Sequence, residues 1–200
     1  MRIILIGGTG TIGREVAKAL SASNEVISAS RSSGDLRIDM ANPESVEAFF
    51  QGVGKFDAIV SAAGSARFGP LDDLEYEDFL FSFRNKLMGQ INLVRIGRNY
   101  INDNGSITLT SGILGREPMP GGSAISMVNA GLEGFVRAAQ LELERGVRVN
   151  VVSPVWVQET LLAMGNKLLE GMPAALVARA YVASVTGTMK GTVLEVDDYT

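Results

Sequence analysis

The fold is decided by residues 2–20, which read RIILIGGTGTIGREVAKAL. The run Arg2–Ile6 is short, apolar and rich in β-branched residues, which is typical of a strand buried on both faces. It ends at Gly7, and from Thr11 onward apolar residues recur at helical spacing. The stretch therefore predicts a buried strand, a glycine-rich turn and an amphipathic helix.

The glycines of this turn have a spacing that suits an anion. They fit Gly8-x-Gly10-x-x-Gly13 and also Gly7-x-x-Gly10-x-x-Gly13. Such glycines allow a tight turn and a close approach of the backbone to a diphosphate, while the helix N-terminus offers unpaired N–H groups. The alternative is a plain glycine turn, but the strand before it and the helix after it favour a dinucleotide cofactor. The cofactor contacts expected here are Gly7, Thr9, Gly10, Thr11, Ile12 and Gly13.

Strand-like and helix-like segments alternate along the rest of the chain. Further strands are expected at residues 25–30, 35–38, 58–60, 106–110, 148–152 and 192–196. Helices are expected from residue 42 and within residues 76–102, 125–144 and 173–184. Regular alternation predicts parallel strands joined by helical crossovers. We therefore predict an α/β fold: one domain over residues 1–200, a Rossmann-type doubly wound parallel sheet of about seven strands with helices on both faces, and a ligand crevice at the carboxyl ends of the strands.

The composition indicates a globular protein and excludes several kinds of site. Apolar residues make up 46% of the sequence and charged residues 20%, which is unlike a disordered chain. The formal net charge of −4 argues against a basic surface for nucleic acid or anionic lipid. The sequence has no Cys and no His, so disulfides, thiolate nucleophiles and the commonest metal ligand are missing. We expect no metal, no nucleic-acid or membrane partner, and a cytoplasmic location, because no targeting or membrane-spanning segment is evident.

The residues after the second expected strand bear on the choice of dinucleotide. An acidic residue at this point would bind the ribose 2′-hydroxyl of NAD, whereas a basic one accommodates the 2′-phosphate of NADP. The sequence here is Ser30-Arg31-Ser32-Ser33, with no acid. Arg31 and Ser32 are therefore predicted to bind the 2′-phosphate. We predict NADP as the cofactor, with NAD as the alternative if Arg31 is only a solvated turn residue.

Motifs farther along the chain occur in a recognisable order. Asp39, Ser61–Gly64, Thr110-Ser111 and Val149–Pro154 follow the glycine turn in sequence. In this order and spacing the chain resembles the short-chain dehydrogenases/reductases over nearly its whole length. The resemblance implies nicotinamide-dependent oxidation or reduction of a small-molecule substrate. It also implies a homodimer or homotetramer, because family members commonly pair through their two long helices.

The resemblance also implies cofactor contacts at other strand ends. Asp39 would contact the adenine ring, and the segment that ends at Gly64 would pack beside the cofactor ribose. The segment after Pro154 would pass the nicotinamide, whose amide would meet the backbone of Val157. Taken singly, each of these residues could be ordinary strand-end packing. The contacts expected from the resemblance are Asp39, Met40, Ala62, Ala63, Gly64, Pro154 and Val157.

The chain departs from this family at its usual catalytic residues. These are a Ser, a Tyr-x-x-x-Lys pair on the next helix, and an Asn on the preceding long helix. The Tyr moves a proton at the substrate oxygen, the Ser binds that oxygen, and the Lys charge lowers the pKa of the Tyr. Ser111 matches the Ser, but Ile125 stands at the Tyr position and Asn129 at the Lys position. Ile125 has no proton to give.

A compensating exchange is one hypothesis for this departure. The family's Asn precedes Leu-x-Gly, and here the residue in that place is Lys86. Lys86 would then supply the positive charge that position 129 lacks, close to the ribose and the substrate carbonyl. Asn85 competes for the same place with the register shifted by one, and an exposed surface lysine is the other reading of Lys86. The candidate catalytic residues are Ser111, Lys86 and Asn129.

Two functions are consistent with this sequence. The first is an atypical NADP-dependent oxidoreductase acting on a small carbonyl or alcohol. The second is an NADP-binding sensor or scaffold without turnover. The absence of a tyrosine at position 125 favours the second, and the apparent exchange between Lys86 and Asn129 favours the first.

Overall fold

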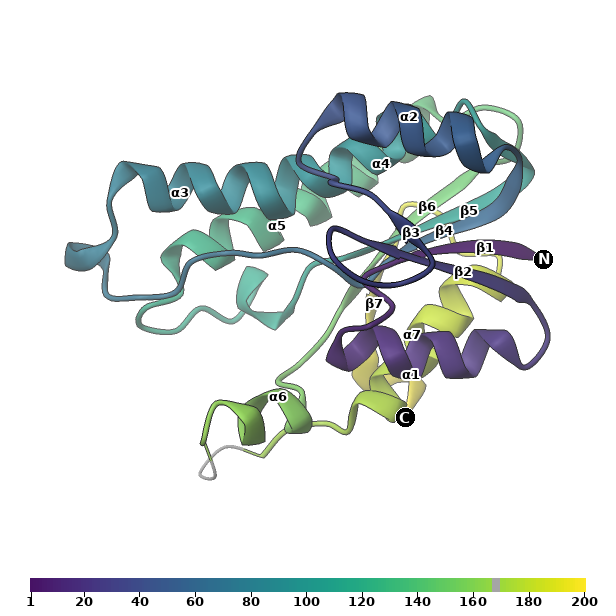
Figure 1. The fold of residues 1–200 in the computed structure, drawn as a ribbon. Coiled ribbons are helices and arrows are strands. Elements are labelled where there is room, and N and C mark those ends of the chain that lie inside the picture. The colour runs from purple at the N-terminus through teal and green to yellow at the C-terminus, as the bar shows by residue number, and fades with distance from the viewer. Residues whose placement is uncertain (167–169) are drawn as a thin grey trace.

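The computed structural model describes residues 1–166 and 170–200, and its centre is a sheet of seven parallel strands (Figure 1). The order across the sheet is β3-β2-β1-β4-β5-β6-β7. The predicted doubly wound parallel sheet is confirmed. The strands are β1 (Arg2–Ile6), β2 (Glu25–Ser30), β3 (Leu36–Arg37), β4 (Phe56–Ser61), β5 (Ile101–Thr110), β6 (Arg148–Ser153) and β7 (Val193–Glu195).

Helices cover both faces of this sheet. Figure 1 shows α2, α4 and α5 over one face and α1 and α7 over the other, with α6 standing away from the sheet. In the part of the chain that the structure describes, none of the helices is long and apolar enough to cross a membrane. The helices are α1 (Thr11–Ser21), α2 (Pro43–Val53), α3 (Tyr76–Ser82), α4 (Gly89–Gly97), α5 (Ser123–Ala139), α6 (Gln158–Ala163) and α7 (Ala174–Thr186).

The first strand shows why the strand sequences lack polar alternation. Ile4 and Ile6 face the core beneath α2, α4 and α5, whereas Ile3 and Leu5 face the core above α1 and α7. All four side chains are buried. A strand with a hydrophobic core on each side has no face left for polar residues.

The strand order reverses beside β1. From β1 the chain moves outward through β2 and β3 to one edge, then returns to β4 on the other side of β1 and continues to β7. In sheets of this kind the loops at the carboxyl ends of the strands diverge at such a reversal and leave a crevice between them. The glycine turn after β1 lies at this point.

The helix between β4 and β5 is interrupted where the sequence predicted one long helix within residues 76–102. A π-helical turn, Phe83–Met88, separates α3 from α4. The helix then ends at Gly97, and β5 begins at Ile101. The expected helix over residues 125–144 is also shorter, because α5 ends at Ala139 and a 3-10 turn follows. Helical periodicity predicted the elements, but it did not predict a π turn, which shifts the following side chains around the helix axis.

Phe50 of α2 offers a test of the core under α2 and α4. Its side chain is fully buried, and its ring lies 5.2 Å from that of Phe56 and 5.9 Å from that of Tyr100, between ring centroids. We expect Phe50→Ala to lower the free energy of unfolding by about 3–5 kcal/mol, because it leaves a cavity that rigid neighbours cannot fill. Urea unfolding measures the change.

The matched control is Leu141→Ala, since Leu141 is 87% exposed. Its expected effect is within about 0.5 kcal/mol. Equal losses from the two substitutions would contradict the described core.

Candidate cofactor and catalytic site

A cavity of about 310 Å³ lies at the reversal of the sheet, where the loops after β1, β2 and β4 meet. Most of the predicted cofactor contacts line it together. Asn85, the competing candidate for the family's Asn position, also lines it. The predicted residues in the wall are Gly7, Thr9, Gly10, Arg31, Ser32, Asp39, Met40, Ala62, Ala63 and Gly64.

At the base of this cavity the backbone of the glycine turn leaves no space for side chains at Gly7 and Gly13. Gly7 has φ +85°, and a Cβ on it would lie 2.8 Å from the Cβ of Ala63. A Cβ on Gly13 would collide with the carbonyl oxygen of Gly7. The amide of Gly10 donates to that same oxygen at 3.0 Å, which closes the turn. Gly7 and Gly13 are therefore steric requirements of the turn, and a ligand can approach its backbone closely.

The start of α1 presents uncapped amides. Gly10 is the N-cap residue, no side chain of the described residues caps this helix, and its first turn carries no acidic residue. The amides of the first turn, which include Thr11, Ile12 and Gly13, have no intrahelical partners at a helix start. Together with the helix dipole they form a site that favours an anion such as a diphosphate.

The loop after β2 is fixed by hydrogen bonds of its serines. The side chain of Arg31 takes no part in these bonds. The Ser30 hydroxyl donates to the carbonyl of Ser33 at 2.6 Å and accepts from the amide of Ser33 at 2.9 Å. The hydroxyls of Thr9 and Ser33 lie 2.8 Å apart and join this loop to the glycine turn. Arg31 is exposed and makes no ion pair or hydrogen bond within residues 1–166 and 170–200. A free guanidinium at the cavity suits a phosphate.

Asp39 and Met40 form the next part of the wall. The backbone amide of Asp39 donates to the hydroxyl oxygen of Ser45 at 2.9 Å, and the Asp39 carboxylate accepts from the amide of Ala41 at 3.1 Å. The buried amide of Asn92 donates to the carbonyl of Met40 at 3.0 Å. These bonds fix the path of the backbone between β3 and α2, so this wall is well defined before any ligand binds.

Lys86 lies between Gly64 of the cavity wall and the carboxyl end of β5. It lies on the π-helical turn, and its Nζ donates to the carbonyl of Ser111 at 2.9 Å. Its aliphatic stem packs against Gly64 of the cavity wall, where a Cβ would lie 2.9 Å from the Cγ of Lys86. The side chain is partly buried, and burial lowers the pKa of Lys86 from 10.5 to about 8. Lys86 is therefore directed inward, toward the ends of β4 and β5.

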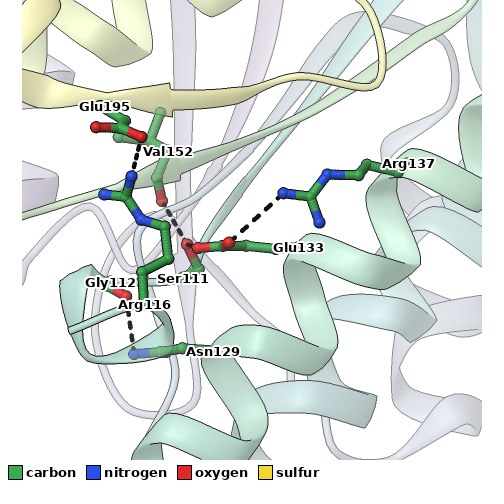
Figure 2. Close-up of polar contacts among 8 residues, drawn as sticks. All are labelled: Ser111, Gly112, Arg116, Asn129, Glu133, Arg137, Val152 and Glu195. Carbon is green, nitrogen blue, oxygen red and sulfur yellow. Dashed lines mark hydrogen bonds and ion pairs between the residues drawn. The ribbon is translucent and has the colours of Figure 1, made fainter. Parts of the chain in front are cut away.

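Asn129 reaches the same loop from the other side. Its Nδ2 donates to the carbonyl of Gly112 at 3.3 Å, as Figure 2 shows, while its Oδ1 is buried with no hydrogen-bond partner among the described residues. Lys86 and Asn129 thus bind the carbonyl oxygens of two consecutive residues, Ser111 and Gly112. The structure brings the three predicted catalytic residues together around this one segment.

The hydroxyl of Ser111 is directed away from the cavity. It donates to the Oε1 of Glu133 at 3.1 Å, and Ser111 is only 3% exposed (Figure 2). Glu133 is 4% exposed, and its Oε2 lies 3.8 Å from Arg137. The sequence analysis did not identify Glu133. Its position four residues after Asn129, and so on the same side of α5, is the signal that could have identified it.

The remaining predicted residues lie at the carboxyl end of β6. The carbonyl of Pro154 accepts from the amide of Ile113 at 2.9 Å, which ties this strand end to the Ser111 loop. Val157 is buried and forms a parallel bridge with Met172. Both residues lie outside the cavity lining, so their predicted contacts with a nicotinamide remain predictions. Arg116, which follows the Ser111 loop, forms an ion pair with Glu195 (Figure 2).

Comparison with known proteins identifies the family. A family model described as enoyl-(acyl carrier protein) reductase matches residues 10–191. The chain belongs to the short-chain dehydrogenase/reductase family. The resemblance seen in the order of the sequence motifs is thereby confirmed.

Two relatives illustrate how similar this short-chain dehydrogenase/reductase is to known enzymes. The 3-oxoacyl-(acyl-carrier-protein) reductase of Mus musculus is 29% identical over 175 residues, which cover 77% of this chain and 74% of the mouse protein. The hydroxynaphthalene reductase of Aspergillus fumigatus is 26% identical over 160 residues, which cover 78% of this chain and 56% of the fungal protein. The chain therefore aligns with little more than half of the fungal enzyme.

Solved structures match over almost the whole length. The protein lin1944 from Listeria innocua is 42% identical with a TM-score of 0.95, and the match covers 98% of this chain and 99% of that one. A small-chain dehydrogenase in complex with NADPH is 29% identical with a TM-score of 0.85, and the match covers 100% and 97%. These similarities agree with the sheet order described above.

A metal site is not evident in this short-chain dehydrogenase/reductase. The described residues contain no group of three or more Asp and Glu side chains that could hold a metal ion. The polar groups around the Ser111 segment are an ammonium, amides, hydroxyls and a buried carboxylate.

Gly13→Ala tests the steric requirement of the glycine turn. Because the new Cβ would meet the backbone oxygen of Gly7, the turn must shift. We expect the dissociation constant for NADPH to rise at least about tenfold, equivalent to about 1.4 kcal/mol. Quenching of protein fluorescence or titration calorimetry measures the affinity.

Gly52→Ala is the matched control, since a Cβ on Gly52 of α2 meets nothing within 4 Å. It should leave NADPH binding unchanged and stabilise the protein slightly, because Ala is the better helix former by about 1 kcal/mol. Unchanged NADPH affinity in Gly13→Ala would show that the dinucleotide does not use this turn.

Proposed function

We propose that this protein is an NADP(H)-dependent oxidoreductase that acts on a small carbonyl or alcohol, with Lys86 as the charged group beside the reacting oxygen. The observation that carries the proposal is the position of Lys86. Its stem packs against Gly64, which lines the cofactor cavity, and its Nζ reaches the end of β5 at Ser111. A cation held between a dinucleotide site and a strand end is placed to stabilise negative charge on a substrate oxygen.

The cavity fits a dinucleotide that carries a 2′-phosphate. The glycine turn and the uncapped start of α1 suit the diphosphate, and the unpaired guanidinium of Arg31 suits the additional phosphate. A structural neighbour at 29% identity was crystallised with NADPH, which supports the same choice here. Bound NADP(H) would supply the hydride chemistry.

The residues of this chain would then hold and orient the substrate. Lys86 would place its ammonium near the substrate oxygen, where its charge favours an alkoxide-like intermediate state. Asn129 would fix the Gly112 carbonyl and so the path of the loop. Ser111 would keep this loop in position through Glu133 and Lys86, and its predicted direct contact with the substrate oxygen requires a rotation of its hydroxyl. Proton delivery in the absence of a tyrosine at position 125 would come through water.

A sensor or scaffold that binds NADP without turnover is the second candidate. Two observations favour it. Ile125 offers no proton, and the Ser111 hydroxyl is engaged by a buried carboxylate. Both candidates share the cofactor site, so affinity alone does not separate them.

Arg31→Ala tests the preference for NADP. We expect NADPH to bind about 10- to 150-fold more weakly, the loss of one charge-assisted bond worth about 1.5–3 kcal/mol, while NADH affinity changes less than about twofold. Calorimetric titration with both dinucleotides provides the measurement. Arg179→Ala is the control, because Arg179 is exposed on α7 and is not part of the cavity. An equal loss for NADPH and NADH would contradict 2′-phosphate binding by Arg31.

Lys86→Met tests the oxidoreductase itself. Wild-type protein is assayed with NADPH and a panel of small aldehydes and ketones, by absorbance of the reduced nicotinamide. We expect Lys86→Met to lower kcat about 100-fold or more while the NADPH dissociation constant changes less than about threefold. Lys190→Met, an exposed lysine, is the matched control. Tight NADPH binding by the wild type with no turnover on any substrate would favour the sensor, and no binding of either dinucleotide would overturn both candidates.

A further inference from the structure

Asn85 is a polar side chain in the wall of the cofactor cavity to which the proposed function gives no role. The sequence offers it only as the competitor of Lys86 for the family's Asn position. The structure separates these two residues, because Asn85 lines the cavity whereas Lys86 is not part of its lining. Asn85 is half-buried, so a ligand in the cavity can reach its side chain.

Two close contacts place the helical segment that carries Asn85. The Cα of Lys86 lies 3.5 Å from the position of a Cβ on Gly64, so the π-helical turn lies against the loop after β4. A Cβ on Gly89, the residue after that turn, would lie 3.0 Å from the Cγ of Met40. Asn85 therefore belongs to the part of the wall that borders both the loop after β4 and the segment between β3 and α2.

One hydrogen bond sets the orientation of the Asn85 amide. Its Nδ2 donates to the carbonyl of Phe81 at 3.0 Å. Its Oδ1 accepts no hydrogen bond from the described residues, and it is not one of the solvent-inaccessible oxygens that lack a partner. A side-chain amide has two N–H donors and one acceptor oxygen. One N–H group and the oxygen of Asn85 thus have no partner among the described residues.

The cavity that Asn85 lines is suited to the adenosine half of the dinucleotide. The 2′-phosphate is carried by the adenosine ribose, and Arg31, which suits this phosphate, lines the same cavity as the glycine turn that suits the diphosphate. The apolar side chains of Ile38, Met40 and Ala63 also line it and suit the flat faces of a base. The wall with Met40 and Asn85 is therefore left for the adenine ring.

The free groups of the Asn85 amide are complementary to adenine. The base presents its 6-amino group as a donor and a neighbouring ring nitrogen as an acceptor. A side-chain amide presents an acceptor beside a donor, and Asn is one of the side chains that bind adenine through two hydrogen bonds in this way. Asp39 also lines the cavity, but its carboxylate has only acceptor oxygens and can supply only one of the two bonds.

We propose that Asn85 recognises the adenine base of the bound dinucleotide. Its Oδ1 accepts a hydrogen bond from the 6-amino group, and its free N–H donates to a neighbouring ring nitrogen. Asn85 then selects adenine over a purine that lacks the amino group. The inference rests on the cofactor part of the proposed function and needs no turnover by the protein.

Deamino-NADPH tests this recognition directly. It carries hypoxanthine, in which a carbonyl oxygen replaces the 6-amino group, so Oδ1 of Asn85 would face an acceptor instead of a donor. Titration calorimetry measures the dissociation constants of NADPH and deamino-NADPH. We expect the wild type to bind NADPH about 5- to 150-fold more tightly than deamino-NADPH, the range for one two-bond contact with adenine. In Asn85→Ala this ratio should fall at least about fivefold.

Asn99→Ala is the matched control, because Asn99 is exposed and is not part of the cavity. It should keep the wild-type ratio. The ratio of two affinities for one variant also cancels any general weakening of the site, since both ligands meet the same protein.

Two results would overturn the proposal and leave NADPH binding in place. One is equal affinity of the wild type for NADPH and deamino-NADPH. The other is an unchanged ratio in Asn85→Ala, even if both affinities fall together, because Asn85 would then support the wall without contacting the base. No binding of either dinucleotide to the wild type would overturn the proposed function as well.

Discussion

The contact between the backbone of Gly7 and that of Gly13 is the constraint on which the cofactor site depends. The two residues are so close that a Cβ on Gly13 would collide with the carbonyl oxygen of Gly7, while a Cβ on Gly7 would collide with Ala62 and Ala63 after β4. This contact brings the start of α1 against the end of β1 and leaves its first amides uncapped. Because β1 lies at the reversal of the sheet, those amides open into the crevice between the loops after β2 and β4. The anion site is thus a consequence of backbone packing and needs no dedicated charged side chain.

Two cationic side chains, Arg31 and Lys86, lie near this glycine turn in different environments. Arg31 stands free at one end of the cavity, where a phosphate would supply its partner. Lys86 lies behind Gly64 of the cavity wall, directed inward, and among the described residues its ammonium binds a peptide carbonyl and no carboxylate. An arginine keeps its charge in either environment, whereas a lysine responds to burial by a lower pKa. The two cations therefore have different uses: one suits a permanent electrostatic contact, and the other suits a group whose protonation changes near neutral pH.

The segment after β5 is where the predicted catalytic residues meet. Lys86 comes from the π-helical turn and Asn129 from α5, and they hold neighbouring carbonyls of this segment. The buried carboxylate of Glu133 accepts a hydrogen bond from the Ser111 hydroxyl. A buried carboxylate is costly unless it is hydrogen-bonded, so this bond indicates that the position of Ser111 is firmly set. Lys86, Asn129 and Glu133 therefore fix this segment by polar contacts from three sides.

The sequence by itself determined the sheet. Strands buried on both faces are continuous apolar runs, and helices with one apolar face have apolar residues at helical spacing, so both can be recognised in the sequence. It also determined the glycine turn, since the contact between Gly7 and Gly13, which excludes a side chain at position 13, lies within that one segment. Only the tertiary structure decided the direction of side chains whose partners are distant in sequence. It turned Ser111 toward Glu133, paired Arg116 with Glu195, and placed Lys86 inward through a π turn that helical spacing does not reveal. These outcomes depend on burial and on contacts between separate elements, and a linear pattern of residue types contains neither.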